Sequence, residues 1–286
     1  MSRKYLYSNE NFNEKSLPST RRGVFKDVLK LHYFSLIKIG LVMFLFAAPL
    51  LVTSFFLDYS FIIAHETGAS NSYTIIICSV IEILCLLFLA IPVSGLGKVF
   101  REYCWLEPVF FVDDFKKGIK DNLKPTLISL LLIGILNLIF NMVFYFSQSG
   151  WLVAIPFGFN VAVLFPILLH TIFINFTYTN KYFVNFKLGC YFYFKHLPSS
   201  LLSVLLLIGI KVYDLFMLAN VLAILTKYLI ILIFFIFLLP MIVLGIQLNE
   251  LRIFDKHINS VRFPHLVNKG LHIETEPNNE GKANEE

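Results

Sequence analysis

Charged residues are scarce in this chain. Lys, Arg, Asp and Glu make up 15% of its 286 residues, whereas hydrophobic residues make up 57%. Soluble domains carry about 25% charged residues, so the composition indicates a membrane as the solvent for most of the chain. The alternative is a soluble protein with unusually large buried helices. The number and length of the apolar runs count against that alternative.

Enzyme motifs are also missing. The sequence has no HExxH, GxSxG or GxxxxGK[ST] motif and no paired Cys/His cluster, and its polar loops are too short to form a soluble active-site domain. Its four cysteines form no CxxC-type motif, so we predict neither disulfides nor a metal site. We expect a protein that is not an enzyme and that uses no cofactor. The alternative is an intramembrane enzyme with unfamiliar catalytic residues.

The sequence does contain six apolar runs that are long enough to cross a membrane. Roughly 20 helical residues at about 1.5 Å each span the ~30 Å hydrocarbon core, and a helix satisfies every backbone polar group where water cannot. We therefore predict an all-α polytopic membrane protein. Its six transmembrane helices are expected at residues 36–57, 73–93, 126–146, 152–172, 201–221 and 228–246.

The runs divide the chain into three parts. Residues 1–35 are polar and cationic, so they form no secretory signal and are expected to be a cytoplasmic segment with an amphipathic helix. Residues 36–247 are the predicted transmembrane domain. Residues 248–286 are a predicted cytoplasmic tail, disordered from about residue 274, where the sequence is acidic and lacks apolar periodicity.

Basic residues mark one side of the membrane. Of the 24 Lys and Arg residues, 21 lie before the first run, in residues 94–125, in residues 173–200 or after Gln247. Two of the three intervening connections carry none, and the third carries only Lys227. By the positive-inside rule both termini are cytoplasmic, in a multi-pass protein of the cell membrane. The net charge of +5 therefore indicates the lipid bilayer as partner, and no nucleic acid.

Three prolines suggest an internal repeat. Pro92, Pro166 and Pro240 stand 74 residues apart. They lie near the predicted cytoplasmic ends of the second, fourth and sixth runs. The segment Leu-Leu-Leu-Ile-Gly-Ile also occurs twice, at residues 130–135 and 205–210. We predict three parallel helix-pair repeats, each preceded by a cytoplasmic interfacial amphipathic helix. The alternative is that Leu-rich spans and basic loops resemble each other through composition alone.

The clearest amphipathic segment precedes the third run. Apolar residues recur every four positions on one face from Phe111, and Asp113 or Asp114 can cap the helix. We expect the apolar face to lie in the acyl boundary of the membrane. The candidate contacts to the membrane or to a partner are Phe115, Lys116, Lys117, Lys120 and Lys124.

Polar residues near the middle of the runs are the candidate site. Buried charges in a membrane usually turn inward and pair, and these residues are Glu82, Asn137, Asn160 and Lys211, with Asp214 three positions after Lys211. One interpretation is a site for a small solute or cation, with Glu82 as its ligand and Lys211 as counter-charge. The other is that Glu82, neutral or bridged to Lys211, holds helices together.

The pattern Pro-x-x-Gly, a basic residue, an acid and then Asp-Phe-x-x-Gly-x-x-x-Asn extends from Pro92 to Asn122. It resembles the YesL-like family of bacterial integral membrane proteins, a domain of unknown function, over about 35 residues. The resemblance implies a bacterial membrane protein that is accessory to carbohydrate ABC transport, and it brings no catalytic residues.

Two functions follow from these observations. The first is a non-enzymatic accessory or assembly partner of a carbohydrate transport system, which contacts a membrane transporter through residues 110–124. The alternative is a small-solute or ion transporter or channel that uses the polar site around Glu82 and Lys211.

Overall fold

The described part of the chain folds into helices joined by short connections. The computed structural model describes residues 17–67, 72–146, 155–156, 158–217 and 221–272, with side chains except at 61–67, 72, 144–146, 208–217 and 221–225. In these ranges all regular elements are helical and no strand occurs. The all-α prediction is therefore confirmed. The predicted disordered tail lies outside the described residues.

Five helical stretches are long and apolar enough to cross a membrane. They are Arg21–Ser60, Tyr73–Cys104, Phe111–Val143, Asn160–Thr177 and Thr226–Arg262. The first three belong to α1 (Arg21–Thr67), which is kinked at His32, and to the helices α2 (Ser72–Cys104) and α3 (Phe111–Phe146).

The last two stretches are composite. The π-helix η3 (Asn160–Leu164) continues into α5 (Phe165–Thr177). In the same way α8 (Val221–Ile233) continues through the π-helix η4 (Phe234–Leu238) into α9 (Leu239–Phe254).

The predicted span at residues 201–221 falls on α7 (Leu197–Met217). Its described apolar portion, Leu197–Leu207, is shorter than a membrane span. The sixth span therefore stays a prediction.

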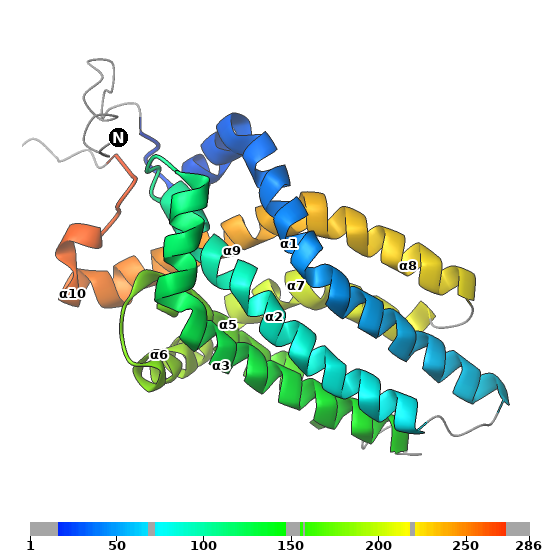
Figure 1. Cartoon of the computed structure of the whole chain (residues 1–286). Coiled ribbons are helices and arrows are strands. Elements are labelled where there is room, and N and C mark those ends of the chain that lie inside the picture. The colour runs from blue at the N-terminus through cyan, green and yellow to red at the C-terminus, as the bar shows by residue number, and fades with distance from the viewer. Residues whose placement is uncertain (1–16, 68–71, 147–154, 157, 218–220, 273–286) are drawn as a thin grey trace, which may run out of the picture.

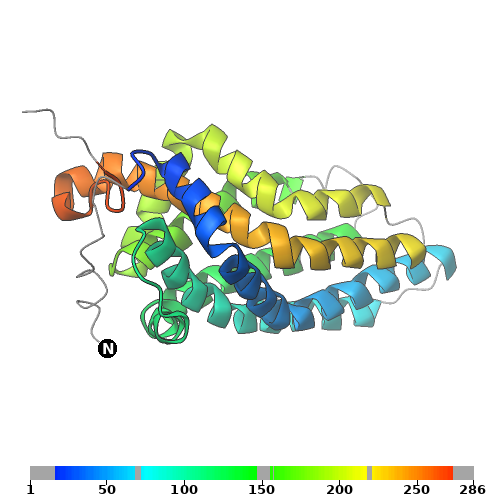
Figure 2. The ribbon, with the colours of Figure 1, turned by 90° about the horizontal axis from the view of Figure 1, so that it is seen from above.

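The long helices lie side by side along one axis of the molecule (Figures 1 and 2). We call the end where α1 begins and α2 ends the proximal end, and the opposite end the distal end. After α9 the chain stays at the proximal end in three short elements. These are η5 (Asp255–Asn259), α10 (Ser260–Arg262) and the 3-10 helix η6 (Pro264–Leu266).

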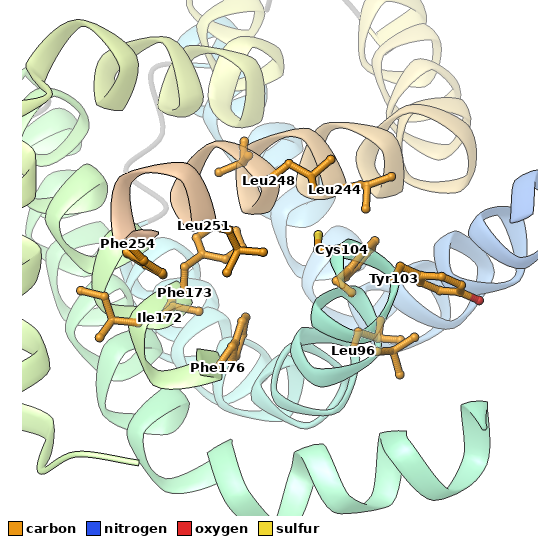
Figure 3. Packing of buried hydrophobic residues seen from close by; sticks show 14 of the residues in the cluster. Leu96, Tyr103, Cys104, Ile172, Phe173, Phe176, Leu244, Leu248, Leu251 and Phe254 are labelled. Carbon is orange, nitrogen blue, oxygen red and sulfur yellow. The ribbon is translucent and has the colours of Figure 1, made fainter. Parts of the chain in front are cut away.

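The ends of α2, α5 and α9 share one hydrophobic core at the proximal end (Figure 3). These are the helices that carry the three equally spaced prolines, and their buried core residues follow the proline except for Leu239, which directly precedes Pro240. The core therefore joins equivalent parts of the three predicted units, although the repeat itself stays a prediction. Its labelled members are Leu96, Tyr103, Cys104, Ile172, Phe173, Phe176, Leu244, Leu248, Leu251 and Phe254.

The amphipathic segments lie on these three helix ends. The first part of α1 ends at the non-helical residue His32 (φ −121°, ψ 20°), and its Phe25 lies beside Gly245 of α9. In α3, a Cβ placed on Gly118 would stand 2.6 Å from the carbonyl oxygen of Gly95 in α2. Helix α6 (Tyr182–Lys195) approaches α5 as closely through Gly189, where a Cβ would stand 2.9 Å from the carbonyl oxygen of Ile167.

Part of the apolar face of residues 111–124 is therefore covered by protein. Phe115 packs over Gly95 of α2, where a Cβ would overlap its ring. Contact of this face with lipid, as the sequence predicts, stays a prediction.

Two of the three prolines follow a widened helical turn. Proline has no N–H and its ring pushes against the carbonyl four residues earlier. The π-helices η3 and η4 end two residues before Pro166 and Pro240. The hydroxyl of Tyr193 donates to the carbonyl of Ala162, four residues before Pro166, at 2.7 Å. The corresponding carbonyl before Pro240, that of Ile236, lies against Gly40 of α1.

We predict that Gly40→Ala lowers the free energy of unfolding by about 1–3 kcal/mol, the usual cost of overpacking. The new methyl group would overlap the Ile236 carbonyl, so α1 and η4 would have to separate. The midpoint of thermal unfolding in detergent measures the effect. Gly158→Ala is the matched control, since a Cβ there has no neighbour within 4 Å. Equal midpoints for the two variants would contradict the predicted contact.

Candidate functional site

Glu82 is buried in α2 at the centre of a polar cluster. Its side chain is 6% exposed. Ser54 of α1 donates from Oγ to Oε1 of Glu82 at 2.9 Å, and Asn141 of α3 donates from Nδ2 to Oε2 at 3.2 Å. Asn141 Nδ2 also donates to Ser79 Oγ at 3.1 Å. One carboxylate therefore joins three helices, as in the helix-holding interpretation.

Glu82 also lines a cavity, which the helix-holding interpretation does not require. The cavity measures about 190 Å³ and lies between α1, α2, α3, α7, α8 and η4. Its apolar walls come from Leu50, Leu51, Leu86, Leu207, Ile231, Phe234 and Phe235. Its polar lining comes from Ser54, Glu82, Asn137, Lys227 and Tyr228.

A second charged group approaches the cavity from α8. Lys227 is 5% exposed, and its Nζ lies 2.5 Å from Oδ2 of Asp58 in α1. The Tyr228 hydroxyl donates to the same Asp58 oxygen at 3.0 Å. Asp58 thus compensates the charge of Lys227.

Three described charged groups lie at or beside the cavity: Glu82 and Lys227 line it, and Asp58 binds Lys227. With Glu82 and Asp58 ionised and Lys227 protonated, these three groups sum to −1, while the side chains of Lys211 and Asp214 on α7 are not described. Both oxygens of Glu82 accept from neutral donors, and among the described side chains none forms an ion pair with it. Charges interact strongly where water is scarce. The cavity is therefore chemically suited to a cation.

The structure brings together some of the predicted site residues. Glu82 and Asn137 line the same cavity. Asn160, at the start of η3, reaches it only through Asn137, because its Nδ2 donates to Asn137 Oδ1 at 3.4 Å. Lys211 and Asp214 lie on α7, in the part of that helix whose side chains are not described. The predicted pairing of Glu82 with Lys211 therefore stays a prediction.

Four polar residues at the site were not predicted from the sequence. They lie in segments that we predicted to be transmembrane spans, for Ser54 and Tyr228, or outer connections, for Asp58 and Lys227. A signal was present for two of them. Lys227 is the only basic residue in the predicted outer connections, and Asp58 opens another of these connections. Isolated opposite charges at the same membrane depth are candidates for a pair.

The predicted lysine face is exposed on the first part of α3. The lysine side chains at positions 116, 117, 120 and 124 are all exposed. The helix start is fixed by Asp114, whose carboxylate is buried and accepts from the backbone N–H of Phe110 at 2.8 Å. The lysines are thus presented on a helix that is capped and packed on α2.

A further buried cluster joins α5, α7 and α9. His170 Nδ1 lies 2.8 Å from Glu250 Oε2, and His170 Nε2 lies 2.7 Å from Ser200 Oγ. The distances resemble those of a Ser-His-acid triad. The Ser200 hydroxyl also donates to the carbonyl of His196 at 2.9 Å, and the direction of its bond with His170 depends on the tautomer of the imidazole. The cluster links three helices, and its three side chains are buried.

Next to this cluster the imidazoles of His196 and His257 lie close together, away from the middle of the apolar helices. His196 Nε2 lies 3.3 Å from His257 Nε2. Burial, followed by the charges of Lys195 and His170, lowers the pKa of His196 below its ordinary value of 6.5. A neutral His196 permits this close contact near neutral pH.

The described residues contain no group of three or more His, Cys, Asp or Glu side chains placed to hold a metal ion. Comparisons of the chain with protein-family models, curated proteins and solved structures found no match. The resemblance to the YesL-like family therefore stays a prediction, and the function has to be argued from the site itself.

Proposed function

We propose that this chain is a multi-pass protein of the cell membrane that binds a small cation at Glu82 as part of a transport or channel activity. The proposal includes six transmembrane helices in three parallel repeats, with both termini cytoplasmic. The cavity that exposes the Glu82 carboxylate between the helices is the observation that carries it. A carboxylate that only held helices together would not need such a space.

Cavity size and lining narrow the ligand class. Sites for drug-sized molecules have volumes of about 300–1,000 Å³, whereas this cavity measures about 190 Å³. Such a volume suits a small ion with part of its hydration shell. Oxygen atoms from Ser54, Glu82 and Asn137 are available in the lining, and hard cations prefer oxygen ligands. The Glu82 carboxylate in the lining, which accepts only from neutral donors among the described side chains, favours a cation over an anion.

We predict that one of lithium, sodium or potassium raises the midpoint of thermal unfolding of the purified protein. A cation at 100 times its dissociation constant adds about 2.7 kcal/mol of stability. Glu82→Gln should abolish this response, because the amide keeps the shape of the carboxyl group but removes its charge. Asp113→Asn is the control, since it removes an exposed carboxylate of α3.

Two outcomes would contradict the cation proposal. One is the same cation response in wild type and Glu82→Gln, which would indicate a general salt effect. The other is a Glu82→Gln protein that is merely unstable while the wild type responds to none of the three cations. That result would favour the helix-holding interpretation.

A second candidate function is supported by the lysine face of α3. Residues 111–124 are held on α2 through Phe115 and Gly118, so the face can be presented without a partner to fold it. Four exposed lysines on one rigid helix suit an acidic surface of another protein. We propose this face as the contact of a non-enzymatic accessory protein with a membrane transporter, such as one for carbohydrates.

We predict that reversing Lys116, Lys117 and Lys120 to Glu releases a protein that co-purifies from native membranes. Like charges across the contact would replace opposite ones. The control is the triple variant Lys181→Glu, Lys187→Glu and Arg262→Glu, which reverses three exposed charges elsewhere. Quantitative mass spectrometry of the purified material gives the recovery. Equal recovery of the partner with both variants would count against this contact.

A further inference from the structure

A basic pocket lies at the proximal end between the first part of α1 and α9, which lie beside each other in Figure 2. The pocket measures about 510 Å³. Its charged lining consists of Arg21, Arg22 and Lys26 from α1 and Arg252 from α9, and among the described residues no carboxylate lines it. Four cations around one pocket create a strong preference for an anionic ligand.

The basic region continues into a neighbouring cavity of about 640 Å³. That cavity shares Arg21, Arg22 and Arg252 with the basic pocket and adds Lys256. Its carboxylate, Asp255, is already bound to Arg21 Nη2 at 2.8 Å. The acid therefore neutralises the innermost arginine and leaves the outer cations to a ligand.

Arg21 supplies a second sign of a missing anionic or water partner. Its side chain is 9% exposed, and its Nη groups bind Asp255 and the carbonyl of Lys269. Its Nε is buried and has no hydrogen-bond partner among the described residues. Buried donors of charged groups are normally satisfied, so a ligand oxygen or a water in the adjoining cavities would complete the arrangement.

An apolar groove runs on from the basic pocket between α7 and α9. This groove measures about 360 Å³, and Leu202 and Leu206 of α7 face Met241 and Ile242 of α9 across it. It shares Phe25 and Gly245 with the basic pocket. A positively charged pocket is thus continuous with an apolar channel on a helix that is apolar enough to cross a membrane.

We propose that this continuous site binds an anionic phospholipid. The phosphate lies among Arg22, Lys26 and Arg252, and one acyl chain follows the groove between α7 and α9. A soluble phosphate compound would use the basic pocket and leave the apolar groove empty, whereas a phospholipid uses both. Basic pockets between membrane helices are known to suit anionic lipid head groups. The site is separate from Glu82 and does not depend on the proposed cation function.

Gly245 offers a direct way to separate the two parts of the site. A Cβ at this position would meet only Phe25, at 3.7 Å, so a larger side chain has room. Gly245→Leu is therefore expected to fold and to block the junction between pocket and groove. Leucine also has a higher helix propensity than glycine, so the substitution favours the helical form of α9.

The test is native mass spectrometry of the full-length protein in detergent, titrated with phosphatidylglycerol or with phosphatidylcholine of the same acyl chains. We expect at least a tenfold preference for phosphatidylglycerol. The triple variant Arg22→Gln, Lys26→Gln and Arg252→Gln should lose that preference. The control variant Lys181→Gln, Lys187→Gln and Arg262→Gln removes the same charge from exposed positions elsewhere and should keep it. Gly245→Leu should weaken phosphatidylglycerol binding at least tenfold.

Soluble anions form the other arm of the experiment. Inorganic phosphate and glycerol 1-phosphate should compete with the lipid at least a hundredfold more weakly than added phosphatidylglycerol does. Equal competition by these anions, together with unchanged binding in Gly245→Leu, would identify a soluble-anion site and overturn the proposal. Equal lipid preference in the triple variant and its control would overturn it as well. If the triple variant does not fold, Arg252→Gln alone provides the comparison, since this side chain is exposed.

Discussion

Polar groups inside helices that are apolar enough to cross a membrane need partners within the protein, because hydrocarbon offers none. The packing of this molecule follows that constraint. The carbonyl before Pro166 receives the hydroxyl of Tyr193, and both oxygens of Glu82 receive donors from neighbouring helices. Lys227 meets Asp58 across α8 and α1. These contacts determine which helices lie together and where a cavity is left among them.

At the proximal end, apolar burial takes over from polar pairing. The ends of α2, α5 and α9 form one core, and an amphipathic segment lies on each of them. On α2 and α5 the contact is a close approach at a glycine, whereas on α9 Phe25 lies beside Gly245 at an ordinary contact distance. Because the apolar faces are used in this way, basic side chains are left at the surface and around the pocket between α1 and α9. The cation proposal and the lipid proposal therefore concern different parts of the molecule, with different physical origins.

The sequence predicted the features that depend on period and position. Of the six predicted spans, five overlap helical stretches long and apolar enough to cross a membrane. The ends of the helices that carry Pro92, Pro166 and Pro240 meet in one core, while the sixth span and the repeat stay predictions. Pairing between side chains that are distant in the sequence was harder to predict. Glu82 and Asn137 were expected to turn inward, and both line the cavity. The approach of Lys227 depends on how α8 rotates against α1, which a single sequence does not specify.

The cation-binding role of Glu82 is most directly tested by infrared difference spectroscopy of the purified protein, recorded as the stabilising cation is added. Binding to an ionised carboxylate should shift the carboxylate stretching band, and the difference band should be absent in Glu82→Gln. That result would place the cation on the carboxylate that lines the cavity. A spectrum without a cation-dependent carboxylate band, or the same band in Glu82→Gln, would contradict the proposed function.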